Sequence, residues 1–142
     1  MASHDSVREP AAVSRQVGLD QAFDGGSLVA LRSAVAAHGD RLGLAGERLG
    51  DLLLVAHELA SNSVRHGGGK GRLRLWAANG AVYCEVEDRG GGFSTDATAV
   101  GYAAPPPGAS NGRGLWLVRQ LSDTVDIRTG VAGTAIVARI AL

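Results

Sequence analysis

The sequence has one cysteine, no net charge and no long apolar run. Cys84 cannot form an internal disulfide alone, which favours the reducing cytoplasm. Fourteen basic residues balance fourteen acidic ones, so no broad field would hold a nucleic acid or an anionic membrane. The first twenty residues carry Asp5, Glu9 and Asp20 without the apolar run of a signal peptide, and nothing approaches a membrane span. We therefore expect a soluble cytoplasmic protein with no nucleic-acid or membrane partner.

Three common site motifs are also absent. His57-Glu58 opens like a zinc-protease helix, but Ser61 stands where the second histidine belongs. His66 comes nine residues after His57, on the opposite side of a helix, so the two could not bind one metal. Neither the phosphate-loop pattern Gly-x-x-x-x-Gly-Lys-Ser/Thr nor an early Gly-x-Gly-x-x-Gly occurs. Zinc-protease, P-loop and Rossmann chemistries are therefore excluded.

What the chain has in excess is glycine: 21 of 142 residues, about twice the usual share. The length fits one domain with a single core. Residues 1–14 are small and polar without periodicity, which indicates a flexible N-terminus, and residues 15–142 form the predicted domain.

The first elements of that domain are a short strand and a helix. Residues 15–23 are predicted as the strand. Asp24 or Ser27 can then cap a helix that runs to about His38 and is ended by Gly39.

The longest predicted helix covers residues 47–66, and Gly67 is placed for a left-handed C-cap. Steps of four residues advance only about 40° around a helix, so Glu58, Asn62 and His66 form a polar ridge beside its apolar face.

The second half of the chain predicts two hairpins. Residues 72–88 alternate around a turn at Asn79-Gly80, and residues 124–142 contain two more alternating runs. Between them lie residues 94–111, long enough for a functional lid, and a short glycine-opened helix at 112–123. The sum is an α+β fold: a two-layer sandwich with a mixed, mostly antiparallel sheet and helices on one face.

The densest basic stretch does not predict a nucleic-acid site. Its cations have one aromatic neighbour, Trp76, and we interpret the segment as a solvated edge; they are Arg65, Lys70, Arg72 and Arg74.

Two polar residues stand at the ends of apolar strand faces. Asp88 ends the row of Val82, Cys84 and Val86, and Thr134 heads the row that leads to Ile140. A carboxylate there needs a partner. Asp88 could cap the following turn, or both side chains could meet the polar atoms of a ligand.

Paired glycines flank the suspected lid: Gly90 and Gly92 before it, Gly112 and Gly114 after it. Glycine allows close backbone approach, and a helix N-terminus offers free amides and a positive dipole end to phosphate. Each pair alone is a weak signal.

The order of these motifs resembles the GHKL or Bergerat ATP-binding fold, which gyrase, the ninety-kilodalton heat-shock chaperones, MutL and sensor histidine kinases share. The order is Glu58-x-x-x-Asn62, Asp88-x-Gly90-x-Gly92, a lid, Gly112-x-Gly114-Leu115 and Gly133-Thr134. The segments "HELASNSVRHG" and "GRGLWLVRQLSD" are similar to those of bacterial anti-sigma factor serine/threonine kinases. Ser63 stands where that family commonly has alanine, and we expect this change to be harmless.

The resemblance implies a site for ATP and Mg²⁺. Glu58 would be the general base, Asn62 would hold Mg²⁺ against the triphosphate, and Asp88, with help from Thr134, would bind the adenine amino group. The other implied nucleotide contacts come from His66, Gly90, Gly92, Gly112, Arg113, Gly114 and Leu115.

It also implies partners: a STAS-type anti-anti-sigma protein that is phosphorylated, a sigma factor that is held inactive, and often a second copy in a homodimer. An alternative is an ATP-binding regulatory module without kinase activity. Glu58 favours the kinase, while the lack of Lys or Arg between Arg89 and Arg113 favours the module. A sensor histidine kinase fragment is disfavoured, because no histidine-bearing dimerisation helix precedes the fold.

Overall fold

The computed structural model describes residues 16–90 and 113–142. The predicted flexible terminus 1–14, the suspected lid 94–111, Gly92 and Gly112 lie outside these ranges. The elements, in chain order, are β1 (Gln16–Asp24), η1 (Gly25–Ser27), α1 (Leu28–Arg41), α2 (Gly46–His66), β2 (Lys70–Ala78), β3 (Ala81–Asp88), α3 (Arg113–Leu121), β4 (Thr124–Gly130) and β5 (Gly133–Ala141).

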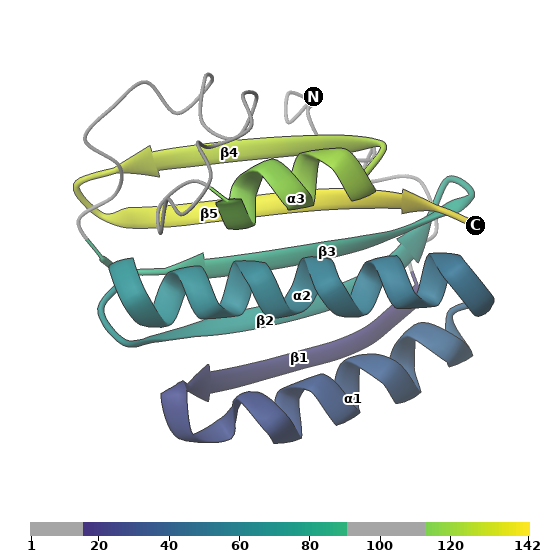
Figure 1. Ribbon diagram of the computed structural model, residues 1–142, viewed down its shortest axis with the longest axis horizontal. Helices are drawn as coiled ribbons and strands as arrows, with labels where there is room; N and C mark the ends of the chain where they lie inside the picture. Colours follow the sequence, from purple (N-terminus) through teal and green to yellow (C-terminus); the bar gives the residue numbers. More distant parts are fainter. Residues whose placement is uncertain (1–15, 91–112) are drawn as a thin grey trace.

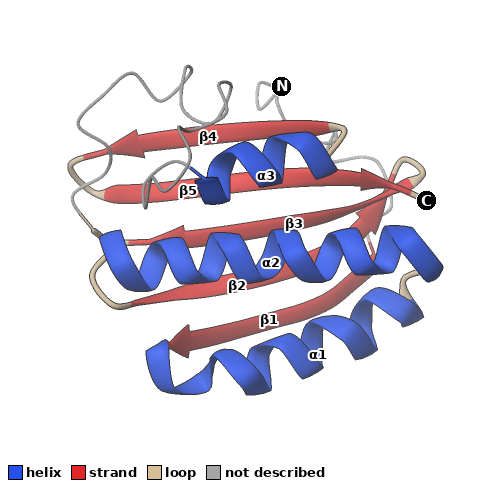
Figure 2. Ribbon diagram, in the orientation of Figure 1, coloured by secondary structure: helices blue, strands red, loops and turns tan. Residues whose placement is uncertain are grey.

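The strands form one sheet in the order β1-β2-β3-β5-β4, and each neighbouring pair among them is antiparallel. The three α-helices lie together on one face of this sheet (Figures 1 and 2). The predicted two-layer α+β sandwich is confirmed. None of the described helices is both long and apolar enough to cross a membrane.

Both predicted hairpins are present. Asn79 and Gly80 have φ angles of 52° and 74°, the positive values that a tight two-residue hairpin turn favours. The second hairpin joins β4 to β5 with Gly130 opposite Gly133.

The core lies between α2 and the middle of the sheet. Leu52, Val55 and Leu59 follow the helical period and are almost completely buried, as are Leu73 and Leu75 of β2. Cys84 is completely buried and packs as a small apolar group, as predicted. The same burial raises the pKa of its thiol to about 12.

Arg65, Lys70 and Arg72 are exposed, as predicted, but the basic residues of β2 do not lie at a sheet edge, because β2 lies between β1 and β3. On the face away from the helices, Arg72 binds Asp20 at 2.5 Å and Arg74 binds Glu87 at 2.6 Å. The hydrogen bond from Arg72 lowers the pKa of Asp20, and the bond to Glu87 raises the pKa of Arg74. Beside them Trp76, 4% exposed, stacks on Tyr83.

The start of the first helical segment follows one of the two predicted caps. The Asp24 side chain accepts a hydrogen bond from the Gly26 amide, and the Ser27 side chain accepts one from the Asp24 amide. This reciprocal pair opens the short 3-10 turn η1, and α1 continues from it.

The predicted end of α1 was wrong, since the helix continues through Gly39 to Arg41. Gly39 is buried where α1 crosses α2, and a β-carbon there would lie 2.6 Å from Leu52 Cδ2 and 2.9 Å from Leu49 Cδ1. Gly43, with a φ of 110°, follows the helix instead. Gly39 therefore allows close packing between the two helices and does not end α1.

Gly39→Ala should lower the free energy of unfolding by about 1 kcal/mol, because the added methyl group overpacks the α1–α2 contact. Gly50→Ala is the matched control: a β-carbon there meets nothing within 4 Å, so helix propensity should raise stability by about 0.5–1 kcal/mol. Urea unfolding of both variants measures the difference. Equal stabilisation by the two substitutions would contradict close packing at Gly39.

Candidate functional site

The carboxylate of Asp88 joins the end of β3 to the end of α2. Ser63 of α2 donates a hydrogen bond to Asp88 Oδ2 at 3.0 Å, and the Gly90 amide donates one to Asp88 Oδ1 at 2.9 Å. The predicted turn cap is therefore confirmed, and Asp88 has a second partner in the helix layer. Because Val82, Cys84 and Val86 are buried on the same strand face, the row that Asp88 was predicted to end is also confirmed.

Three glycines allow close packing of the backbone and the carboxylate at Asp88 and the end of α2. A β-carbon on Gly67 would overlap the Asp88 carboxylate, and one on Gly90 would lie 2.5 Å from Gly67 Cα. A β-carbon on Gly133, whose φ is 134°, would overlap the Asp88 carbonyl. Only glycine fits these positions with the present backbone.

Gly67 was predicted to adopt the left-handed conformation, and this was wrong. Its φ is −109°, while its amide donates to the Ser63 carbonyl at 2.7 Å as the helix ends. The positive φ angles belong to the next two residues, Gly68 and Gly69. Position 67 needs glycine for the approach of Asp88.

Thr134 is paired with Asp88 in the antiparallel register of β3 and β5. Its side chain is 7% exposed, and its hydroxyl lies 2.9 Å from the hydroxyl of Thr129. Register therefore places these two polar residues, each predicted to stand at the end of an apolar strand face, side by side at the same end of the core.

The polar ridge of α2 continues this site. Glu58 and Asn62 are half-buried, and His66 is exposed at the end of the helix. Among the described residues, the side chains of Glu58 and Asn62 have neither a hydrogen-bond nor an ion-pair partner. Half-buried polar groups without protein partners are suited to a ligand.

The N-terminus of α3 faces this ridge. A β-carbon on Gly114 would lie 2.7 Å from Glu58 Oε1, so glycine lets the carboxylate approach the first turn of the helix. Arg113 is exposed, and Leu115 is 5% exposed and anchors α3 in the core. The start of α3 therefore presents free amides, a positive dipole end and one arginine beside Glu58.

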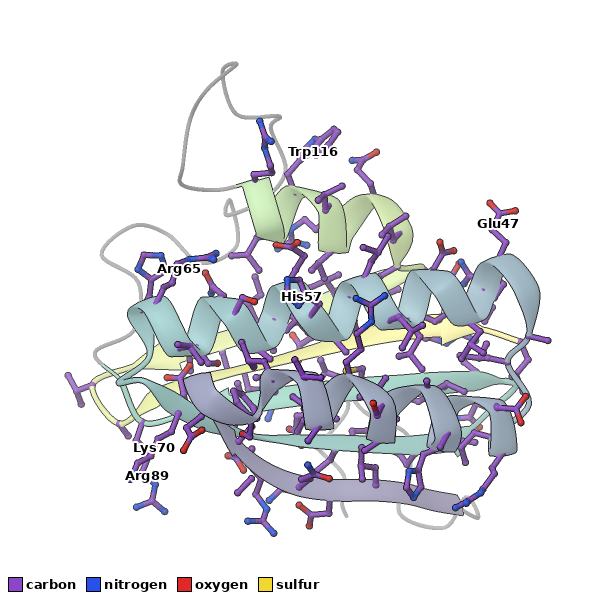
Figure 3. The ribbon with its side chains drawn as sticks, turned by 60° about the horizontal axis from the view of Figure 1, so that its bottom comes forward. Glu47, His57, Arg65, Lys70, Arg89 and Trp116 are labelled. Carbon is purple, nitrogen blue, oxygen red and sulfur yellow. The ribbon has the colours of Figure 1, made fainter. Side chains whose placement is uncertain are left out.

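Figure 3 shows how α2 presents its side chains. Glu47 projects from its first turn, His57 from its middle and Arg65 from its last turn. His57 is exposed, and its Nε2 lies 3.5 Å from Ser61 Oγ. His57 is not among the residues that surround Asp88, which include Ser63, Gly90 and Thr134.

Comparisons with known proteins agree with this geometry. Residues 22–140 match the family model described as "Histidine kinase-like ATPase domain". Among curated proteins, no significant match to the chain is found. Among solved structures, the histidine kinase domain of the blue-light activated histidine kinase from Erythrobacter litoralis EL346 is similar, with a TM-score of 0.56 and 20% identity. The match covers 96% of this chain and 71% of that chain, and at this identity it shows a shared fold.

The described residues fit a nucleotide and a divalent cation. The Asp88 carboxylate is held in place by Ser63 and Gly90 and lies next to the buried hydroxyl of Thr134, a polar pair that can recognise an amino group. The side-chain oxygen of Asn62 is a ligand type that Mg²⁺ accepts, and phosphates supply others. Gly92 and Gly112, predicted to contact the nucleotide, lie outside the described residues.

Ser63, whose presence in place of the family's common alanine is expected from the sequence to be harmless, binds the Asp88 carboxylate. It is 3% exposed and lies on the apolar face of α2, one residue after Asn62. A hydroxyl in an otherwise apolar helical row was the available signal, but its partner is 25 residues away and comes close only in the folded protein.

Ser63→Ala should weaken ATP binding about three- to tenfold, because Asp88 loses a hydrogen bond that orients its carboxylate. Ser61→Ala is the matched control, since Ser61 is also buried on α2 but faces His57. Isothermal titration calorimetry gives both affinities. If Ser61→Ala weakens binding as much as Ser63→Ala, the effect belongs to the helix and not to the bond with Asp88.

Proposed function

Because this chain belongs to the histidine kinase-like ATPase domain family, an ATP-binding family of the GHKL type, we propose that it is an anti-sigma factor type protein serine/threonine kinase. Its substrate would be a STAS-type anti-anti-sigma protein, and its regulatory target a sigma factor. It would use ATP with Mg²⁺.

The observation that carries the kinase proposal is the position of Glu58. Its carboxylate approaches the first turn of α3, one helical turn from Asn62, and has no partner among the described residues. A domain that only binds ATP does not need an uncommitted carboxylate beside the phosphate-binding helix end. A kinase needs one to accept a proton.

In the proposed reaction, a serine or threonine hydroxyl of the partner attacks the γ-phosphorus of ATP. The bond from the hydroxyl oxygen to phosphorus forms, the bond to the β–γ bridging oxygen breaks, and ADP leaves. Glu58 accepts the hydroxyl proton. Asn62 would hold Mg²⁺, which would supply positive charge to the triphosphate, while the amides of α3 and Arg113 would stabilise the phosphate oxygens.

The choice of partners is supported by the sequence of two described helices. "HELASNSVRH" in α2 and "RGLWLVRQL" in α3 resemble the corresponding segments of anti-sigma factor kinases. The homodimer that the resemblance implies is part of the same proposal.

A regulatory ATP-binding module without kinase activity is the second candidate. The cluster of Asp88, Ser63 and Thr134 can hold an adenine group without any help from Glu58. The sequence between Arg89 and Arg113 also contains no Lys or Arg to assist transfer.

Asp88→Asn should weaken ATP binding by about 1–3 kcal/mol, because a charge-assisted hydrogen bond to adenine becomes a neutral one. The fold should survive, since the Asn amide can still accept from Gly90 and donate to the Ser63 hydroxyl. Glu87→Gln is the control, because this neighbouring residue faces the opposite side of the sheet and binds Arg74. Unchanged ATP affinity in a folded Asp88→Asn variant would refute the nucleotide assignment.

Glu58→Ala should reduce phosphate transfer about 10²- to 10⁴-fold while nucleotide affinity is retained, because the proton acceptor is lost. Glu47→Ala is the control: this exposed glutamate lies in the first turn of the same helix. The assay follows label from ATP to candidate STAS proteins in the presence of Mg²⁺.

The outcomes separate the two candidates. Transfer by the wild type and its loss in Glu58→Ala support the kinase. Normal transfer by Glu58→Ala shows that the base is misassigned. ATP binding without transfer to any STAS protein favours the regulatory module.

A further inference from the structure

A cavity of about 450 Å³ lies at the end of the sheet where β2 begins. Four segments line it: β1, the α2–β2 connection, the start of β2 and the end of β3. Ala22 and Arg72 are register partners, as are Arg72 and Glu87, so these three residues form one row across the sheet. Their strand neighbours Leu73 and Val86 are buried under the helices, so this row belongs to the opposite face.

The same register brings two further cations to the cavity. Lys70 stands two residues before Arg72 on β2 and so shares its face, and Arg89 follows the end of β3, two residues after Glu87. Both residues line the cavity, and Figure 3 shows their side chains extending together from this end of the sheet.

Some of the charged side chains around the cavity have protein partners, and others have none among the described residues. Arg72 binds Asp20, Glu87 binds Arg74, and the Asp88 carboxylate accepts hydrogen bonds from Ser63 and Gly90. Lys70 and Arg89, in contrast, have no hydrogen-bond or ion-pair partner among the described residues. Two neighbouring like charges repel each other, and a dianion between them removes this repulsion and gains hydrogen bonds from both.

We propose that this cavity is a binding site for a small phosphate-bearing ligand, whose phosphate group is held by Lys70 and Arg89. Arginine offers a planar fork to phosphate oxygens, and lysine supplies a compact point charge. Lys70 and Arg89 are distinct from Glu58 and Asn62, although Asp88 and Gly67 line both this cavity and the proposed nucleotide site. The proposal does not depend on the kinase assignment.

The size and the remaining wall indicate what kind of ligand carries the phosphate. The volume falls within the range of about 300–1,000 Å³ that small-molecule sites occupy, and it exceeds what one phosphate group fills. Ala22 and the backbone of Gly67, Gly68 and Gly71 form a wall without large side chains. A flat or narrow organic group can lie against this wall while its phosphate meets the cations.

The test uses inorganic phosphate as the probe and the whole chain labelled with ¹⁵N. A non-hydrolysable ATP analogue with Mg²⁺ first saturates the nucleotide site, and phosphate is then titrated while the amide resonances of residues 67–71 are followed. We expect saturable shifts in the wild type. The double variant Lys70→Gln, Arg89→Gln should bind phosphate at least about tenfold more weakly, because two charge-assisted contacts are lost.

Arg41→Gln is the matched control, since Arg41 is exposed at the C-terminal end of α1, away from the cavity. It should leave the phosphate response unchanged. Absence of saturable shifts in the wild type, equal shifts in the double variant, or an equal response to acetate would each overturn the proposal. The titration is repeated without the analogue, so failure to bind nucleotide counts against the proposed function and not against the cavity.

Discussion

The close approach of the end of α2 to the end of β3 is the constraint on which the site depends. Asp88 lies in the space that a side chain at position 67 would fill, and Ser63 and Gly90 bind its two oxygens. The helix layer and the sheet are therefore joined at this end through the Asp88 carboxylate. Because its partners hold it on two sides, this carboxylate is preorganised, and recognition of a ligand needs little further ordering of the protein.

Polar groups in this fold fall into those that the protein satisfies and those that it leaves available. Arg72 and Arg74 form ion pairs with Asp20 and Glu87 on the sheet face away from the helices. Glu58 and Asn62, on the helix side, have no partner among the described residues, and the same holds for Lys70 and Arg89. The first set lies on α2 and the second at the start of β2 and just after β3, so the two sets are available to different ligands.

Most elements could be predicted from the sequence, because helices and hairpins depend on periodicity and on turn residues that are close in the chain. The polar ends of the apolar rows, Asp88 and Thr134, were also visible from alternation alone. The prediction failed where a residue's role depends on a distant neighbour. The sequence predicts that Gly39 ends a helix, but Gly39 lies inside α1 and packs against Leu52. It also predicts a left-handed cap at Gly67, but this glycine makes room for Asp88.

The sequence by itself determined the order of the elements, the face on which each side chain lies and the motif order that identifies the family, since these follow from local spacing. Only the tertiary structure decided that Ser63 binds Asp88, that Gly114 admits Glu58, and that Lys70 and Arg89 line one cavity. The reason is physical: periodicity sets the direction of a side chain, whereas the distance between two side chains depends on how closely their helices and strands pack.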